Sequence, residues 1–137
     1  MSHFKTLAFF SLGLALLLPL SSWAENWVFL REANDNTQTL DMDSVKHQAN
    51  GMTSFLTKHR YHSEQNNGSV RYWETIHYMR FDCPSRKVSE DEQEARDANG
   101  NYVTSWDYED YGEEYFPQNT YVPSDVSGDI EFRMVCK

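Results

Sequence analysis

Residues 70–83 have the sequence VRYWETIHYMRFDC, which is the clearest strand signal in the chain. Side chains alternate between the two faces of a strand. One face of this segment carries Trp73, Thr75, His77, Met79, Phe81 and Cys83. The opposite face carries Val70, Tyr72, Glu74, Ile76, Tyr78 and Arg80. We expect the face with Cys83 to be the core side, because a disulfide partner must reach it from within.

Other segments predict shorter elements. Residues 39–41 predict a short strand that ends where Asp43-Ser44 starts a turn. The heavily charged residues 85–96 predict an edge strand, where charge blocks further pairing. Asn99-Gly100 is the commonest type I′ hairpin signal and places residues 102–107 antiparallel to the segment before it.

The last segment is ambiguous from its periodicity alone. Ile130, Phe132, Met134 and Cys136 alternate with other residues, as in a strand. Val126, Ile130 and Met134 lie four residues apart, as in a helix opened by Ser124.

Residues 1–24 have the parts of a secretory signal peptide: a positive Lys5, an apolar run over residues 7–20, and small residues ending at Ala24. The alternative is a membrane anchor, but the apolar run is shorter than the roughly 20 residues that span a bilayer. No cysteine lies near the expected cleavage site. We therefore expect residues 25–137 to be exported as a single domain, to the periplasm, the cell surface or the medium, without a lipid anchor and without a membrane span.

The exported chain is acidic in one region. The formal net charge of the whole chain is −9, and removal of Lys5 with the signal peptide makes it −10. Residues 89–114 carry ten acidic residues and one basic residue. Nucleic acid is disfavoured as a partner, because phosphate binding needs clustered Lys and Arg. An acidic lobe steers basic partners toward it, although it also serves simply to keep a protein in solution.

Cys83 and Cys136 are the only cysteines in the chain. Export places them in an oxidising compartment, where two cysteines predict one structural disulfide. A redox-active pair is the alternative, but a Cys-x-x-Cys motif is missing from the sequence.

The order of landmarks along the chain resembles the surface-adhesin protein E family of exported bacterial proteins. The landmarks are Trp27-Val28, residues 40–45 (LDMDSV), Phe81-Asp82-Cys83, Asn99-Gly100, Val122-Pro123-Ser124 and Cys136. The resemblance implies an α+β fold, with an antiparallel sheet of about six strands and a C-terminal helix tied to it by the disulfide. It also implies adhesin-like contact with a host or envelope protein, such as a component of the host extracellular matrix.

The chain departs from the family in three places. It lacks the lipid-attachment cysteine of the namesake adhesin, and Ala95-Arg96-Asp97 stands where a tyrosine usually precedes the Asn-Gly turn. Residues 107–114 are unusually acidic. The last departure indicates a different partner.

The sequence favours binding over catalysis. His59 and His62 lie three residues apart, so a strand would place them on opposite faces and they would not share a metal ion. Residues 97–101 lack the spacing of a calcium loop. No nucleophile motif is present, and neighbouring acids in a loop are usually solvated. We therefore expect no catalytic residue, no metal and no cofactor. A hydrolase that uses two of the carboxylates remains an alternative.

The most suggestive feature is the acidic aromatic segment 106–116. Its candidate partner-binding residues are Trp106, Asp107, Tyr108, Glu109, Asp110, Tyr111, Glu113 and Glu114. The alternative places Trp106, Tyr115 and Phe116 in the core. A second candidate surface comprises Tyr72, Ile76 and Tyr78, which would equally suit a homodimer interface or lie under the C-terminal helix. The leading prediction is a binding module for a basic or host protein. The alternative is a periplasmic inhibitor or immunity protein.

Overall fold

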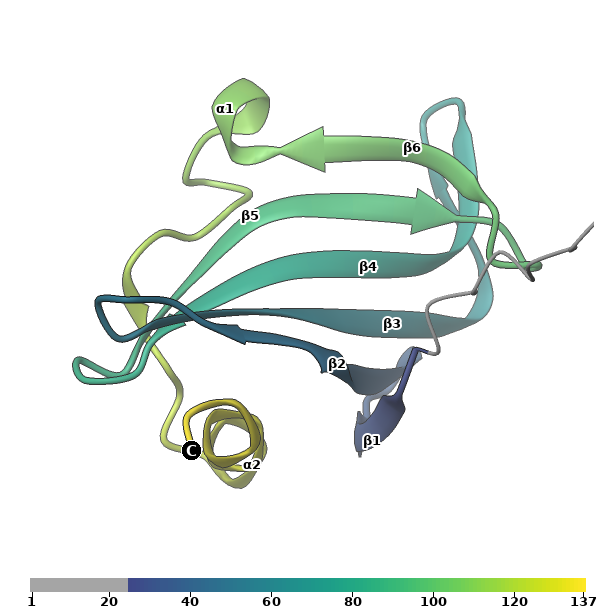
Figure 1. The fold of residues 1–137 in the computed structure, drawn as a ribbon. Helices are drawn as coiled ribbons and strands as arrows, with labels where there is room; N and C mark the ends of the chain where they lie inside the picture. Colours follow the sequence, from purple (N-terminus) through teal and green to yellow (C-terminus); the bar gives the residue numbers. More distant parts are fainter. Residues whose placement is uncertain (1–24) are drawn as a thin grey trace, which may run out of the picture.

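The structure, a computed structural model, describes residues 25–137. The predicted signal peptide, residues 1–24, lies outside the described residues. The described chain forms one antiparallel sheet in the order β1-β2-β3-β4-β5-β6, with β7 paired to β5 (Figure 1). The strands are β1 (Trp27–Glu32), β2 (Asn36–His47), β3 (Met52–Asn67), β4 (Val70–Asp82), β5 (Lys87–Arg96), β6 (Tyr102–Asp107) and β7 (Thr120–Tyr121). The helices are α1 (Tyr108–Tyr111) and α2 (Val126–Val135).

The predicted α+β fold is confirmed. The sheet follows the expected antiparallel order, the last segment is a helix, and a disulfide joins Cys83 to Cys136. The core lies on the face of the sheet that carries Phe55 and Phe81, which we call the inner face. The opposite, outer face carries Leu56, Ile76 and Tyr78.

Helix α2 packs on the inner face through few side chains. The ring of Phe132 lies 5.6 Å from that of Phe81, centroid to centroid, and Val135 is fully buried. Arg86 forms an ion pair with Asp129 and stacks on Phe132. A helix of ten residues is marginal in water by itself, so these contacts and the disulfide hold it in place.

The cap of α2 leads to a testable prediction. Asp125, and not the predicted Ser124, is the N-cap, and its side chain accepts a hydrogen bond from the Gly128 N–H at 2.8 Å. Asp125→Ala is expected to lower the free energy of unfolding by about 1 kcal/mol, the usual cost of losing a cap. Ser124→Ala is the matched control and should change it by much less. Urea unfolding measures both, and a larger loss for Ser124→Ala would assign the cap to that residue.

Strand β2 is longer than predicted. It runs from Asn36 to His47, so the predicted turn at Asp43-Ser44 is wrong. Residues 42–45 instead form a bulge, and the pairing with β3 resumes at Lys46. Turn-forming residues here satisfy the backbone of an irregular strand.

The predicted edge position of residues 85–96 is also wrong. Strand β5 is internal, with β4 on one side and β6 and β7 on the other. Its charges have partners on β4, because Asp91 pairs with Arg80 and Glu90 pairs with His77. Oppositely charged cross-strand pairs stabilise a sheet, so a charged segment is tolerated inside it.

The hairpin between β5 and β6 forms where it was predicted, but its turn is not type I′. Of its central residues only Gly100 has a positive φ, +80°. The Gly100 N–H donates to the Asp97 carbonyl at 3.0 Å, and the Asp97 side chain accepts from the Asn99 and Asn101 N–H groups. This is a type I turn followed by a glycine bulge.

Candidate functional site

The acidic aromatic segment 106–116, which we call the acidic tip, follows β6 and contains α1. Its exposed tyrosines are Tyr108, Tyr111 and Tyr115, with 37%, 50% and 63% of their surface accessible. The acids exposed beside them are Glu109, Asp110, Glu113 and Glu114. In Figure 1, α1 lies beyond the end of β6, on the side of the molecule far from α2. The tip therefore presents phenol rings and carboxylates together to solvent.

Three residues support the tip from beneath. Phe116 is buried, as the alternative interpretation expected, whereas Tyr115 is exposed and that expectation for it was wrong. Trp106 is half-buried, with its ring 5.8 Å from that of Tyr72. Asp107 caps α1, since its Oδ1 accepts from the Asp110 N–H at 2.9 Å. Trp106 and Asp107 thus hold the tip in shape rather than forming its exposed surface.

The second predicted surface does not form one exposed patch. Tyr72 contacts the rings of Tyr61 and Trp106 on the inner face, and burial raises the pKa of its hydroxyl. The cause is a large bulge in β3, where residues 61–64 stand opposite the single residue Trp73. The regular alternation of side chains does not hold through this irregular part of the hairpin. The outward placement of Tyr72 was therefore wrong.

Ile76 lies on the outer face, as predicted, but it is fully buried. Its cross-strand neighbours are Lys58 on β3 and Glu94 on β5. The alkyl stems of such long side chains cover apolar surface while their charged ends stay in water. Ile76 is therefore not available to a partner. Helix α2 covers the inner face, so this part of β4 does not lie under the helix either.

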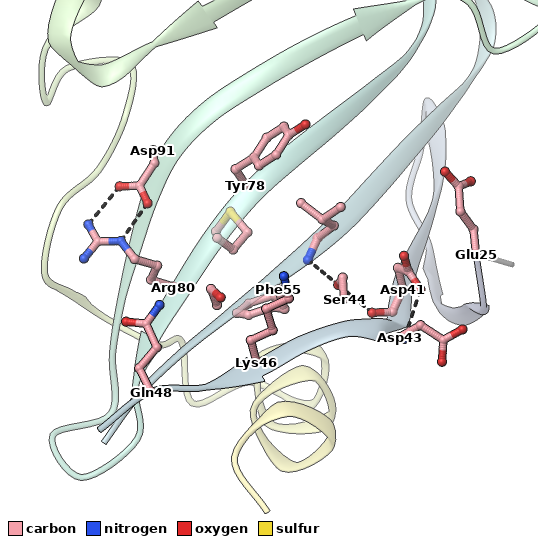
Figure 2. Close-up of a pocket in the computed structure, with 13 residues that line it drawn as sticks. Glu25, Asp41, Asp43, Ser44, Lys46, Gln48, Phe55, Tyr78, Arg80 and Asp91 are labelled. Carbon is pink, nitrogen blue, oxygen red and sulfur yellow. Dashed lines mark hydrogen bonds and ion pairs between the residues drawn. The ribbon is translucent and has the colours of Figure 1, made fainter. Parts of the chain in front are cut away.

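Tyr78 lines a cleft of about 670 Å³ on the outer face (Figure 2). The apolar side chains on this face of the cleft are Leu56 and Tyr78, and the strand residues Phe55 and Met79, whose side chains face the core, also border it. The carboxylates are Glu25, Asp41, Asp43 and Asp91, and the cations are Lys46 and Arg80. Figure 2 shows Glu25, Asp41 and Asp43 toward one end and Arg80 with Asp91 toward the other. Ligand pockets typically measure about 300–1,000 Å³.

The bulge in β2 builds the acidic end of this cleft. The Oδ1 of Asp41 accepts from the Asn26 N–H at 3.1 Å and from the Asp43 N–H at 3.0 Å. The hydroxyl of Ser44 donates to the Asp41 carbonyl and accepts from the Leu56 N–H at 2.8 Å. Because these bonds replace part of the ladder between β2 and β3, the two strands separate and the cleft opens.

The other end of the cleft is neutralised. Arg80 donates to both oxygens of Asp91, at 2.6 and 2.8 Å, and to the Oε1 of Gln118 at 3.3 Å. Bidentate pairing fixes the guanidinium and cancels its charge. Tyr78 is fixed as well, because its hydroxyl donates to Glu94 at 3.1 Å. Burial, together with the Glu94 carboxylate, raises the pKa of Tyr78 to about 12.

A smaller pocket of about 190 Å³ lies on the inner face, with walls from β1 to β5 and from α2. The rings of His59 and His77 lie 4.0 Å apart. The Nδ1 of His77 is 2.7 Å from a Glu90 oxygen, and its Nε2 is 2.8 Å from the Thr75 hydroxyl. Glu131 of α2 also lines the pocket. Helix and sheet therefore meet through a polar network next to the apolar core.

Two groups in this inner pocket have strongly shifted pKa values. Burial raises the pKa of Glu131 to about 7, and the charge of Arg31 opposes the increase. Burial lowers the pKa of His59 to about 3, and the charges of His77 and Arg31 act in the same direction. In both cases the buried site disfavours the charged form. The stability of the fold therefore depends on the protonation of this pocket.

Residues 25–137 contain neither a metal-binding cluster nor a membrane-spanning helix. Within residues 25–137, no group of three or more His, Cys, Asp or Glu side chains is placed to hold a metal ion. His62 pairs with Glu32 at 2.6 Å and His59 stacks on His77, so the two histidines do not share a site. In the same part of the chain, no helix is long and apolar enough to cross a bilayer.

Sequence patterns did not identify the cleft or the inner pocket. Their residues come from several strands and meet only after the sheet has formed. One signal was available for the cleft, since Asp41, Asp43 and Ser44 interrupt a segment with the length and alternation of a strand. Short polar residues of this kind mark bulges as well as turns.

In comparisons of the chain with known proteins, no family model, no curated protein and no solved structure matches it.

Proposed function

We propose that this chain is a non-enzymatic, exported binding module of a bacterial cell envelope that contacts a basic protein through the acidic tip. The supporting observation is the exposure of Tyr108, Tyr111 and Tyr115 among carboxylates on a rigid base. Tyrosine supplies contact area at low entropic cost, and the carboxylates steer a basic partner. The resemblance to the surface-adhesin protein E family adds a host matrix or envelope protein as the class of partner.

The environment of the tip favours binding over hydrolysis. Hydrolysis by two carboxylates needs one of them to be held protonated in an enclosed site. The tip residues Glu109, Asp110, Glu113 and Glu114 are instead exposed. Exposed carboxylates stay charged at neutral pH and attract cations at a distance, which suits recognition.

Charge reversal at the tip tests this proposal. Glu113→Lys/Glu114→Lys is expected to slow association with a basic partner by about tenfold at low salt, because it converts steering into repulsion. The partner is captured from envelope extract or host serum with residues 25–137, identified by mass spectrometry, and then measured by surface plasmon resonance. Circular dichroism checks that the variant folds.

The matched control is Glu32→Lys/Glu64→Lys, which changes net charge equally at exposed positions away from the tip. Glu64 pairs with Arg71, and Glu32 pairs with His62 and accepts hydrogen bonds from the Thr37 hydroxyl. These contacts are exposed, and exposed pairs contribute little stability. Equal slowing by both double variants would show that net charge, and not the tip, governs the association. The tip would then not be the binding surface.

A periplasmic inhibitor or immunity protein is the second candidate. The projection of α1 beyond the end of β6 favours it, because a protruding acidic helix suits entry into a basic active site (Figure 1). The activity of the captured partner separates the two functions. A hydrolase or toxin inactivated by the wild-type chain, and not by Glu113→Lys/Glu114→Lys, would favour inhibition over adhesion.

A further inference from the structure

The outer-face cleft is separate from the acidic tip and has features of a ligand site. It combines an apolar lining with a carboxylate end, and it has the volume of a typical ligand pocket. We propose that this cleft binds an extended peptide segment of a partner protein, in which a Lys or Arg side chain neighbours an apolar side chain. This inference does not depend on the function proposed for the tip.

The carboxylate end of the cleft favours a ligand with a cationic group. Three carboxylates, Glu25, Asp41 and Asp43, line the cleft. Lys46 offsets one of their charges, and Arg80 at the other end is already paired with Asp91. Asp41 is 6% exposed, and only its Oδ1 receives hydrogen bonds from residues 25–137. A poorly hydrated carboxylate attracts a cation more strongly than one in bulk water.

The apolar lining of the cleft favours a ligand that carries an apolar group beside its cation. Leu56 and Tyr78 are cross-strand neighbours on the outer face and supply the apolar side chains of the cleft. The hydrogen bond from Tyr78 to Glu94 holds the ring in place. Removing such surface from water stabilises an apolar ligand group. A free polyamine carries charge without apolar side chains, so a peptide complements this cleft better.

The order of groups along the cleft predicts a spacing in the ligand. Tyr78 lies between the carboxylate end and the Arg80–Asp91 pair (Figure 2), and Leu56, its cross-strand neighbour, is paired on its other side with Asp41. In an extended peptide, side chains at positions i and i+2 point to the same side, about 7 Å apart. A Lys-x-Leu spacing would therefore place an ammonium group at the carboxylates and an isobutyl group on Leu56.

Fluorescence anisotropy with synthetic peptides tests the proposal. The probe is fluorescein-labelled Lys-Ser-Leu-Ser-Lys-Ser-Leu, mixed with residues 25–137 in 150 mM salt, where screening acts over about 8 Å. Peptides with Glu for Lys, or with Ser for Leu, are expected to bind at least about tenfold more weakly. Spermine should not displace the probe. Displacement by spermine, or equal binding of the Ser peptide, would show that charge alone is recognised and would overturn the proposal.

Variants locate the binding. Asp43→Lys and Leu56→Gln are each expected to weaken probe binding by about tenfold, while the tip variant Glu113→Lys/Glu114→Lys leaves it unchanged. Leu56 is half-buried, so Leu56→Gln also affects folding, and weaker binding by this variant does not by itself locate the peptide. Amide chemical-shift mapping on the wild-type chain gives a second readout, with shifts expected at Ser44, Leu56 and Tyr78. Shifts confined to the tip, or no binding, would overturn the cleft proposal. The tip is judged by capture of its own partner, so either proposal fails independently.

Discussion

Replacing both Cys83 and Cys136 with serine is expected to lower the free energy of unfolding by about 4 kcal/mol. The disulfide joins residues 53 positions apart, and a cross-link that closes so long a loop removes much entropy from the unfolded chain. Native domains are typically stable by about 5–15 kcal/mol. The bond is therefore expected to supply a large share of the stability of this chain.

The position of the bond in the folded structure leads to the same prediction. It ties the C-cap of α2, Cys136, to the end of β4, and α2 otherwise relies on Phe132, Val135 and the Arg86–Asp129 pair. Urea unfolding with and without a reductant measures the effect. Reduction should move the wild-type midpoint to that of the double serine variant, and it should leave the variant unchanged. A reduced wild type as stable as the oxidised one would show that the bond does not constrain the chain.

The sheet was predictable because a long strand with alternating side chains has one obvious buried face. Residues 70–82 form the whole of β4 and Cys83 follows it, with Phe81 buried and Cys83 bonded as expected. The pairing of the two cysteines followed from their number and from the expected export. Both signals are local or compositional and do not depend on which strands become neighbours.

The C-terminal helix was predicted, but the apolar spacing that favoured a helix does not mark its buried side. The spacing of Val126, Ile130 and Met134 indicated a helical stripe, yet Val126 and Ile130 are 77% and 41% exposed. Met134 packs against the core together with Phe132, and Val135 is part of the core. A ten-residue helix fixed at its end by a disulfide is oriented by that bond as much as by its own pattern, and sequence periodicity does not show that orientation.

The candidate surfaces show the same division between local and long-range signals. Composition identified the acidic tip, but the exposure of Tyr115 and the supporting role of Trp106 depend on how the tip packs on β5 and on Tyr72. The bulge in β2 opened the cleft, and Tyr72 lies on the inner face where the pairing of β3 with β4 is interrupted. Each bulge depends on pairing between strands, which a single sequence does not reveal.

The inner pocket leads to the second large prediction, an opposite pH dependence for two variants. Burial raises the pKa of the Glu131 carboxyl from 4.5 to about 7, so the folded chain loses stability as the pH rises through that range. Burial lowers the pKa of His59 from 6.5 to about 3, so the folded chain loses stability as the pH falls through that range. Between pH 4.5 and 6.5 the two effects oppose each other, and their sum changes little.

Removing one group at a time should expose the effect of the other. Glu131→Gln is expected to be more stable than wild type by about 2 kcal/mol at pH 8 and to gain little at pH 4.5. His59→Phe keeps a ring stacked on His77, and it should gain about 2 kcal/mol at pH 4.5 and little at pH 8. Urea unfolding across this pH range measures both, and subtracting the wild-type curve removes the titration of groups that all three chains share. Parallel curves for the three proteins would mean that neither side chain is held away from water. The inner pocket between α2 and the sheet would then not govern how the free energy of unfolding depends on pH.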